Sequence, residues 1–162
     1  RLNGDTIRGG KGKMTDAGTR VPFVAYQPGT VEAGQISSNL IDFSDFLPTT
    51  LEAVGVAAPQ DIDGQSFLWQ LRGKTGEPRK WIHIFYHPRP EKGISLAFVR
   101  TQRYKLYRDG RFYDVLSDVN EEIPLSESGL NRQAMDAYVL LSEALKTMPV
   151  DGRMLLKYGN RK

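Results

Sequence analysis

The closely spaced strand patterns between residues 81 and 115 constrain the fold of this 162-residue chain more than any other feature. Aromatic and β-branched residues cluster in short runs at residues 81–86, 94–101, 104–108 and 111–115. Asp109-Gly110 separates the last two runs and is typical of a hairpin turn, because both residues tolerate a positive φ. The pattern predicts three or four short antiparallel strands.

A helical pattern follows these strands. Between residues 131 and 147 the chain alternates polar and apolar residues at helical spacing, with Ala134, Tyr138, Leu141 and Leu145 on one face. An amphipathic helix needs an apolar partner, and the open face of the sheet offers one. We therefore predict that residues 76–162 form a subdomain in which a C-terminal helix packs on a small antiparallel sheet.

The preceding residues show a different organisation. The first twenty are polar and contain five glycines, which predicts an extended loop. Residues 21–26 (VPFVAY) form a short apolar run that suits a buried strand. Residues 39–55 predict a helix with an apolar stripe and Gly55 as its stop. A shorter helix is predicted at 66–72, and a polar linker at 73–80.

Composition excludes several classes of function. The net charge of +3 arises from 22 basic and 19 acidic residues without any long basic run, so we expect no nucleic-acid binding. No apolar stretch approaches the roughly 18 to 20 residues of a membrane span, so we expect no membrane partner. The absence of cysteine excludes disulfides and thiolate chemistry.

Gly9-Gly10-Lys11-Gly12-Lys13 is the first candidate for chemistry. Glycines allow the backbone to approach a ligand closely, and a lysine between them places a cation against an oxyanion. The spacing fits neither a Walker A motif nor GxGxxG. By local sequence alone, a surface loop and an anion site both remain open.

Several further motifs follow Lys11 in a defined order. They are Asp16, Gly18, Arg20, Pro22, Pro28-Gly29, LIDF at 40–43, LPT at 47–49, Val54-Gly55, DGQS at 63–66, VRTQRYKL at 99–106, FYDV at 112–115 and DVNE at 118–121. This succession, from residue 9 to about residue 125, closely resembles the sulfatase family. Asp16-Ala17 stands where that family most often has Glu-Gly, and Val119-Asn120 replaces its usual proline-containing turn.

The resemblance implies both a fold and an activity. It implies an α/β fold of the alkaline-phosphatase-like sulfatase type, in which residues 1–75 are the last part of the catalytic domain and 76–162 the C-terminal subdomain. It implies that Lys11 binds sulfate, and that the parent protein hydrolyses sulfate esters with a formylglycine nucleophile and calcium. A periplasmic or secreted location follows from the same resemblance.

Other polar residues are weaker candidates. The family's C-terminal subdomain helps to shape the substrate pocket, which makes Tyr86, His87 and Arg89 candidates for substrate binding; a plain surface loop is the alternative. His83 and His87 are spaced for a metal only on a helix, and Pro88 argues against one there, so we predict no metal site. Asp42 and Asp45 could belong to a site, but they suit helix capping better.

The nucleophile motif of the sulfatase family, C/S-x-P-x-R, is absent from the chain. We therefore expect the chain alone to be inactive, with no cofactor of its own, and calcium to be bound only in the parent. The alternatives are a fragment of a related phosphodiesterase or phosphonate hydrolase, and a non-catalytic binding module. We also expect exposed apolar surface around residues 21–26 and 39–55, and hence marginal stability, self-association or a poorly ordered N-terminal portion.

Overall fold

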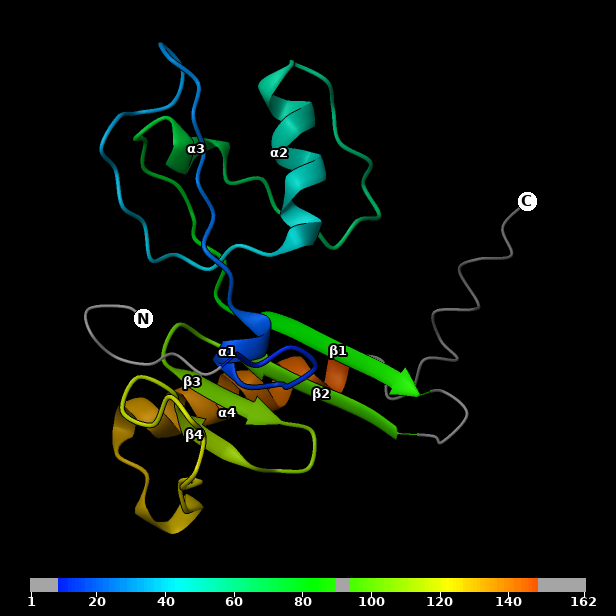
Figure 1. Ribbon diagram of the computed structural model, residues 1–162, viewed down its shortest axis with the longest axis vertical. Helices are drawn as coiled ribbons and strands as arrows, with labels where there is room; N and C mark the ends of the chain where they lie inside the picture. The colour runs from blue at the N-terminus through cyan, green and yellow to red at the C-terminus, as the bar shows by residue number, and fades with distance from the viewer. Residues whose placement is uncertain (1–8, 90–93, 149–162) are drawn as a thin grey trace. The chain divides into compact units, whose positions relative to one another are not determined.

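The computed structural model describes residues 9–89 and 94–148 (Figure 1). The chain divides into two compact units. The sheet unit combines the described residues of Arg1–Val21 and His83–Lys162, and the middle unit is Pro22–Ile82. The predicted boundary between residues 75 and 76, which concerned the domains of a larger protein, stays a prediction.

The sheet unit contains four strands in the order β1-β2-β3-β4, as the spacing of the β-rich runs predicted. Phe98 of β2 lies opposite Tyr107 of β3, and Lys105 of β3 lies opposite Tyr113 of β4, both in antiparallel register. The strands are β1 (Ile82–Arg89), β2 (Ile94–Arg100), β3 (Tyr104–Tyr107) and β4 (Phe112–Asp114).

Of the two residues expected in the turn between β3 and β4, only Gly110 has the expected positive φ. Gly110 has φ 92°, and its N–H donates to the Tyr107 carbonyl at 3.0 Å. Asp109 has no positive φ; its carboxylate accepts from the Arg111 N–H instead. A glycine in the left-handed region at the end of the turn is typical of longer hairpin loops.

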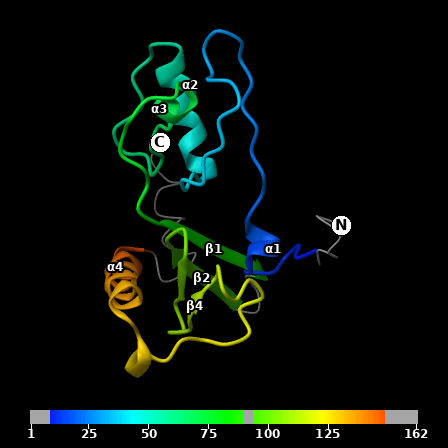
Figure 2. The ribbon, with the colours of Figure 1, turned by 90° about the vertical axis from the view of Figure 1, so that its left-hand side faces the viewer.

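Helix α4 (Arg132–Thr147) packs on one face of the sheet, as predicted (Figure 2). Asn131 caps it by accepting the Ala134 N–H at 2.9 Å. Ala134 and Leu141 are buried as the helical spacing predicted, and Tyr138 meets the Phe112 ring edge-on, with centroids 5.2 Å apart.

The opposite face of the sheet carries an apolar cluster: Met14, Phe98, Tyr107, Tyr113 and Val115, with Ile84 and Tyr86 packed against it. Met14 belongs to the glycine-rich N-terminal segment, and helix α1 (Asp16–Thr19) follows it directly. Figure 2 shows α1 and α4 on opposite sides of the sheet. The predicted featureless loop is therefore wrong over 16–19, because a short helix forms where the chain packs on the sheet.

The middle unit contains the 3₁₀ helix η1 (Phe43–Asp45), α2 (Phe46–Ala53) and α3 (Leu68–Leu71). Gly55 has φ 74°, consistent with its predicted role as a helix stop, and Gly73, which follows α3, has φ 62°. The predicted helix at 39–55 begins only at Phe43. None of the described helices is long and apolar enough to cross a membrane.

The predicted strand at residues 21–26 is wrong. The segment has irregular backbone, and Val24 and Tyr26 are each 87% exposed. A strand needs a neighbour for its backbone N–H and C=O groups, and within the described residues no strand pairs with this segment.

Candidate functional site

The candidate lysine lies on a tight turn, which we call the lysine turn (residues 10–13). The Lys13 N–H donates to the Gly10 carbonyl at 2.7 Å, and Gly12 has φ 79°, as the third residue of a type II turn requires. Lys11 and Lys13 are both exposed. Within residues 9–89 and 94–148, the Lys11 ammonium forms no ion pair.

Two glycines bring the lysine turn into backbone contact with α1. A Cβ placed on Gly18 would lie 2.2 Å from the Lys13 carbonyl oxygen and 2.3 Å from that of Gly10. A Cβ on Gly10 would lie 2.5 Å from the Ala17 carbonyl carbon. At these distances, a side chain at either glycine would require the backbone to shift. The lysine turn and α1 are therefore packed directly against each other.

Asp16, the first residue of α1, attaches α1 and the lysine turn to the sheet. Its carboxylate accepts from the Arg100 guanidinium at 2.5 Å and from the Lys105 ammonium at 3.4 Å. Lys105 also donates to the Met14 carbonyl at 2.9 Å. Three polar contacts therefore fix residues 14–16 on the same face of the sheet as the apolar cluster.

Lys105 is fully buried, so its charge must be compensated inside the protein. Glu121, whose side chain is 3% exposed, accepts from the Lys105 ammonium at 2.6 Å and from the Tyr107 hydroxyl. The Phe98 ring centroid lies 4.2 Å from the ammonium, which adds a cation–π contact.

The loop that supplies Glu121 is held in an unusual conformation. Glu121 has φ 58°, the only positive φ of a non-glycine residue in the described chain. Its N–H donates to the Asp118 carbonyl at 3.1 Å, and the Asp118 carboxylate accepts the Ile123 N–H at 2.8 Å. Asp118 and Glu121, the first and last residues of the DVNE motif, thus form one turn that places the Glu121 carboxylate in the buried cluster.

The pKa shifts of Asp16 and Tyr107 are consistent with the hydrogen bonds and ion pairs of this buried cluster. Burial raises the pKa of the Asp16 carboxyl, but the hydrogen bonds and charges of Arg100 and Lys105 outweigh burial, and the net pKa is below its usual value. Burial and the hydrogen bond to Glu121 raise the pKa of the Tyr107 phenol far above its usual value. Asp16 is therefore ionised and Tyr107 neutral at physiological pH.

A hollow of about 250 Å³ lies beside the lysine turn. The Tyr86 hydroxyl lies 3.4 Å from the position of a Cβ on Gly12, so one of the weaker candidate residues does lie near the turn. The hollow is lined by Gly12, Lys13, Met14, Gly18, Thr19, Ile84, Phe85 and Tyr86.

The other candidates on β1 lie elsewhere. Side chains alternate along a strand, so His87 lies on the opposite face from Tyr86, with its ring centroid 5.9 Å from that of Phe85. Arg89 ends β1, and its side chain lies outside the described residues. Within the described part of the chain, no group of three His, Cys, Asp or Glu side chains is arranged to hold a metal ion.

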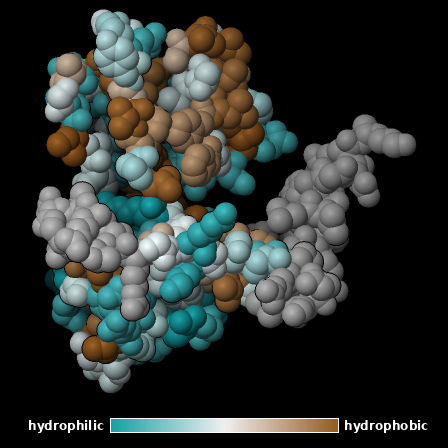
Figure 3. Space-filling model, viewed as in Figure 1, coloured by the Kyte–Doolittle hydropathy of each residue, from teal (hydrophilic) through white to brown (hydrophobic). Residues whose placement is uncertain are grey.

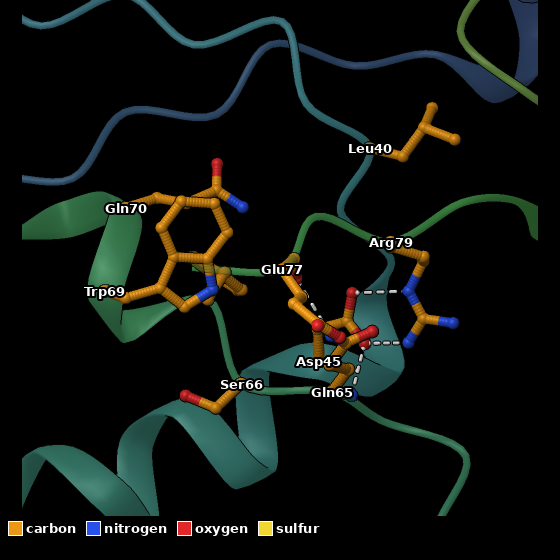
Figure 4. Close-up of a pocket in the computed structure, with 9 residues that line it drawn as sticks. Leu40, Asp45, Gln65, Ser66, Trp69, Gln70, Glu77 and Arg79 are labelled. Carbon is orange, nitrogen blue, oxygen red and sulfur yellow. Dashed lines mark hydrogen bonds and ion pairs between the residues drawn. The ribbon is translucent and has the colours of Figure 1, made fainter. Parts of the chain in front are cut away.

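The middle unit has a polar cluster of its own, around Asp45 (Figure 4). Asp42 and Asp45 form a capping box at η1, as predicted, and the Asp45 carboxylate also accepts from the Gln65 N–H at 2.7 Å and from Arg79. The pocket beside them has a volume of about 10 Å³, enough for a single water at most. These carboxylates are structural, and the DGQS motif serves to hold η1.

Comparison with known proteins places these motifs in one family. Residues 10–128 match the sequence model of the C-terminal domain of N-sulphoglucosamine sulphohydrolase. An ulvan-active sulfatase of Formosa agariphila is 35% identical over 113 residues, covering 66% of this chain and 22% of the relative. An N-acetylglucosamine-6-O-sulfatase of Bacteroides thetaiotaomicron is 31% identical over 113 residues, covering 63% and 20%.

A solved structure of a protein in complex with its substrate D-glucosamine-2-N,6-O-disulfate is 27% identical, with a TM-score of 0.52. The match covers 63% of this chain and 23% of that protein. The chain thus spans about a fifth of the length of the relatives that it matches.

Proposed function

The chain belongs to the sulfatase family, and from this premise we propose that it is the C-terminal part of an enzyme that hydrolyses sulfate esters. Within this enzyme, Lys11 binds the sulfate group. The supporting observation is a lysine whose backbone is held by a packed turn while its ammonium has no ion pair in the described chain.

The chemistry of sulfate-ester cleavage explains what such a cation would do. Negative charge develops on the nonbridging and leaving oxygens as the S–O bond breaks, and a fixed positive charge close to them lowers the energy of the transition state. A turn that is already ordered loses little entropy when the substrate binds. Lys11 would supply such a charge, and the backbone of its turn is already packed.

The remaining catalytic groups are proposed to come from outside this chain. The sequence contains no C/S-x-P-x-R motif that could supply a formylglycine, and the described residues offer no set of carboxylates that fits calcium. We expect the chain alone to show no turnover of a sulfate ester, and turnover by the purified chain would contradict this expectation.

We propose a sulfated sugar as the substrate class. The named relatives act on ulvan and on N-acetylglucosamine sulfate, and the solved neighbour binds a glucosamine disulfate. These names do not favour the alternative of a phosphodiesterase or phosphonate hydrolase. A periplasmic or secreted location, which suits an enzyme acting on polymeric sugars, is part of the same proposal.

The test is to replace Lys11 in the full-length protein that contains this chain. Lys11→Ala should lower kcat/KM on a glucosamine sulfate by about 10²-fold or more, the usual cost of losing a group that stabilises an oxyanion. Lys13→Ala is the matched control, because Lys13 is an exposed lysine on the same turn. Equal effects of the two substitutions would refute the role of Lys11.

Substrate class is tested in the same protein by comparing a sulfated monosaccharide with an aryl sulfate and a phosphate diester. A strong preference for the sulfated sugar is expected. Faster hydrolysis of the phosphate diester would favour the alternative function.

A further inference from the structure

We propose that Asp16 is a positioning residue for Lys11, and that the buried cations Arg100 and Lys105 act on the reaction through it. This inference rests on the proposed function, since it assumes that Lys11 contacts the sulfate group. It assigns a catalytic consequence to a cluster of charges that lies on the sheet rather than in the lysine turn itself.

Asp16 is connected mechanically to Lys11 through α1. Asp16 begins α1, and α1 packs on the lysine turn through backbone atoms of Gly10, Lys13 and Gly18. Backbone contacts this close cannot be lengthened or shortened by side-chain rotation. A displacement of α1 therefore displaces the turn that carries Lys11.

Asp16 is held by groups that are themselves fixed. Arg100 is 7% exposed at its side chain and also donates to the carbonyls of Thr101 and Gln102, both at 3.0 Å. Lys105 is held from its other side by Glu121 at 2.6 Å. The Asp16 carboxylate thus sits between two cations whose own positions are set by the sheet.

The rate of a catalysed reaction depends strongly on the position of each charged group that stabilises the transition state. A group that stabilises a transition state must lie within a fraction of an ångström of its productive position, and a shift of about 1 Å can cost about 10²-fold in rate. Asn in place of Asp16 keeps the size of the side chain but removes its charge. The charge-assisted contacts to Arg100 and Lys105 are weakened, and the lysine turn gains freedom.

A merely structural role makes a different prediction. If Asp16 only stabilised the fold, Asp16→Asn would lower activity by the same factor whether or not Lys11 was present. If Asp16 acts through Lys11, the substitution has nothing left to disturb once the Lys11 ammonium is gone. The two roles are therefore separated by a double-mutant cycle.

The experiment uses the full-length protein with Asp16→Asn, Lys11→Ala and the double variant, assayed for kcat/KM on a glucosamine sulfate, with the Tm of each recorded. Asp16→Asn is expected to lower kcat/KM about 10-fold to 100-fold in the native background and by less than about 2-fold in the Lys11→Ala background. Asp109→Asn, in an exposed ion pair with Arg111, is the control and should leave activity unchanged.

Each other outcome has a distinct meaning. Equal losses in the two backgrounds, or no loss from Asp16→Asn, would overturn the positioning role while leaving the role of Lys11 intact. No loss from Lys11→Ala would overturn the proposed role of Lys11 in sulfate binding, and the positioning role with it. Should Asp16→Asn fail to fold, Arg100→Gln loosens the same carboxylate from its partner's side, and the same cycle is run with it.

Discussion

Replacing Lys105 by methionine removes the charge from the centre of the buried cluster while keeping most of the side-chain volume. The Glu121 carboxylate, 3% exposed, would then keep only the Tyr107 hydroxyl as a partner, and the Met14 carbonyl would lose its donor. Breaking a buried ion pair on one side typically costs about 3–5 kcal/mol, because a charge is left without compensation. We expect a loss of this size for the sheet unit.

The chain contains a matched comparison. Lys146 and Glu143 on α4 form an ion pair with the same N···O distance of 2.6 Å, but their side chains are 70% and 65% exposed. Lys146→Met should therefore cost less than about 1 kcal/mol, since water already screens and solvates both charges. The N···O distance is equal in the two pairs, so the difference between the variants reflects the burial of Lys105 together with its additional contacts to Met14, Asp16 and the Phe98 ring.

The assay must report on the sheet unit alone. Both tryptophans, Trp69 and Trp81, lie in the middle unit, so their fluorescence reports on the unfolding of that unit and not of the sheet unit. Hydrogen exchange of the β3 amides is suitable: Lys105→Met should lower their protection by roughly 10²-fold or more, and Lys146→Met by less than about 10-fold. Similar losses in the two variants would refute the reasoning. With Glu121→Gln present, Lys105→Met should cost less, because no buried carboxylate remains unpaired.

Two further predictions concern pH and association. Tyr107→Phe removes a donor to Glu121 and should cost about 1–3 kcal/mol at neutral pH. Because burial and Glu121 raise the pKa of Tyr107, its stabilisation is complete below the unfolded value of about 10 and is lost as pH rises further. The difference between the native chain and this variant, measured by urea unfolding followed by circular dichroism, should therefore shrink above pH 10; a constant difference would contradict the linkage. The middle unit exposes Phe43 (78%), Leu47 (53%) and Val54 (69%), and Figure 3 shows apolar surface gathered on this unit. The chain by itself should therefore associate with rising concentration in sedimentation experiments, and a monomer that resists proteolysis throughout residues 9–75 would contradict this.

The sheet and its covering helix could be predicted from sequence because both signals are local. The β-rich runs are separated by turn residues, and Gly110 adopts the positive φ that its position demands. The helix at residues 132–147 is indicated by the helical spacing of its apolar residues and by Asn131, which caps it. The capping role of Asp42 and Asp45 was equally accessible, since a helix start has a short, recognisable pattern.

The charge cluster was missed, although a signal for it existed. Alternation along β2 and β3 places Arg100 and Lys105 on the same face as Phe98 and Tyr107. Two cations on an otherwise aromatic face require buried acids as partners. Their identity could not be read from the chain, because Asp16 lies 84 residues from Arg100, Glu121 lies 16 from Lys105, and the sequence has 19 acidic residues.

The segment at residues 21–26 shows why an apolar sequence pattern can predict a strand that does not form. Its apolar residues encode a preference for burial, but a strand also needs a second backbone to satisfy its N–H and C=O groups. Within the described residues no such partner is present, and Val24 and Tyr26 remain 87% exposed. The segment lies inside the region matched by the family, and the chain spans about a fifth of its relatives. We therefore propose that the pattern encodes a contact with residues outside this chain, so that the exposed segment and the expected self-association have one physical cause.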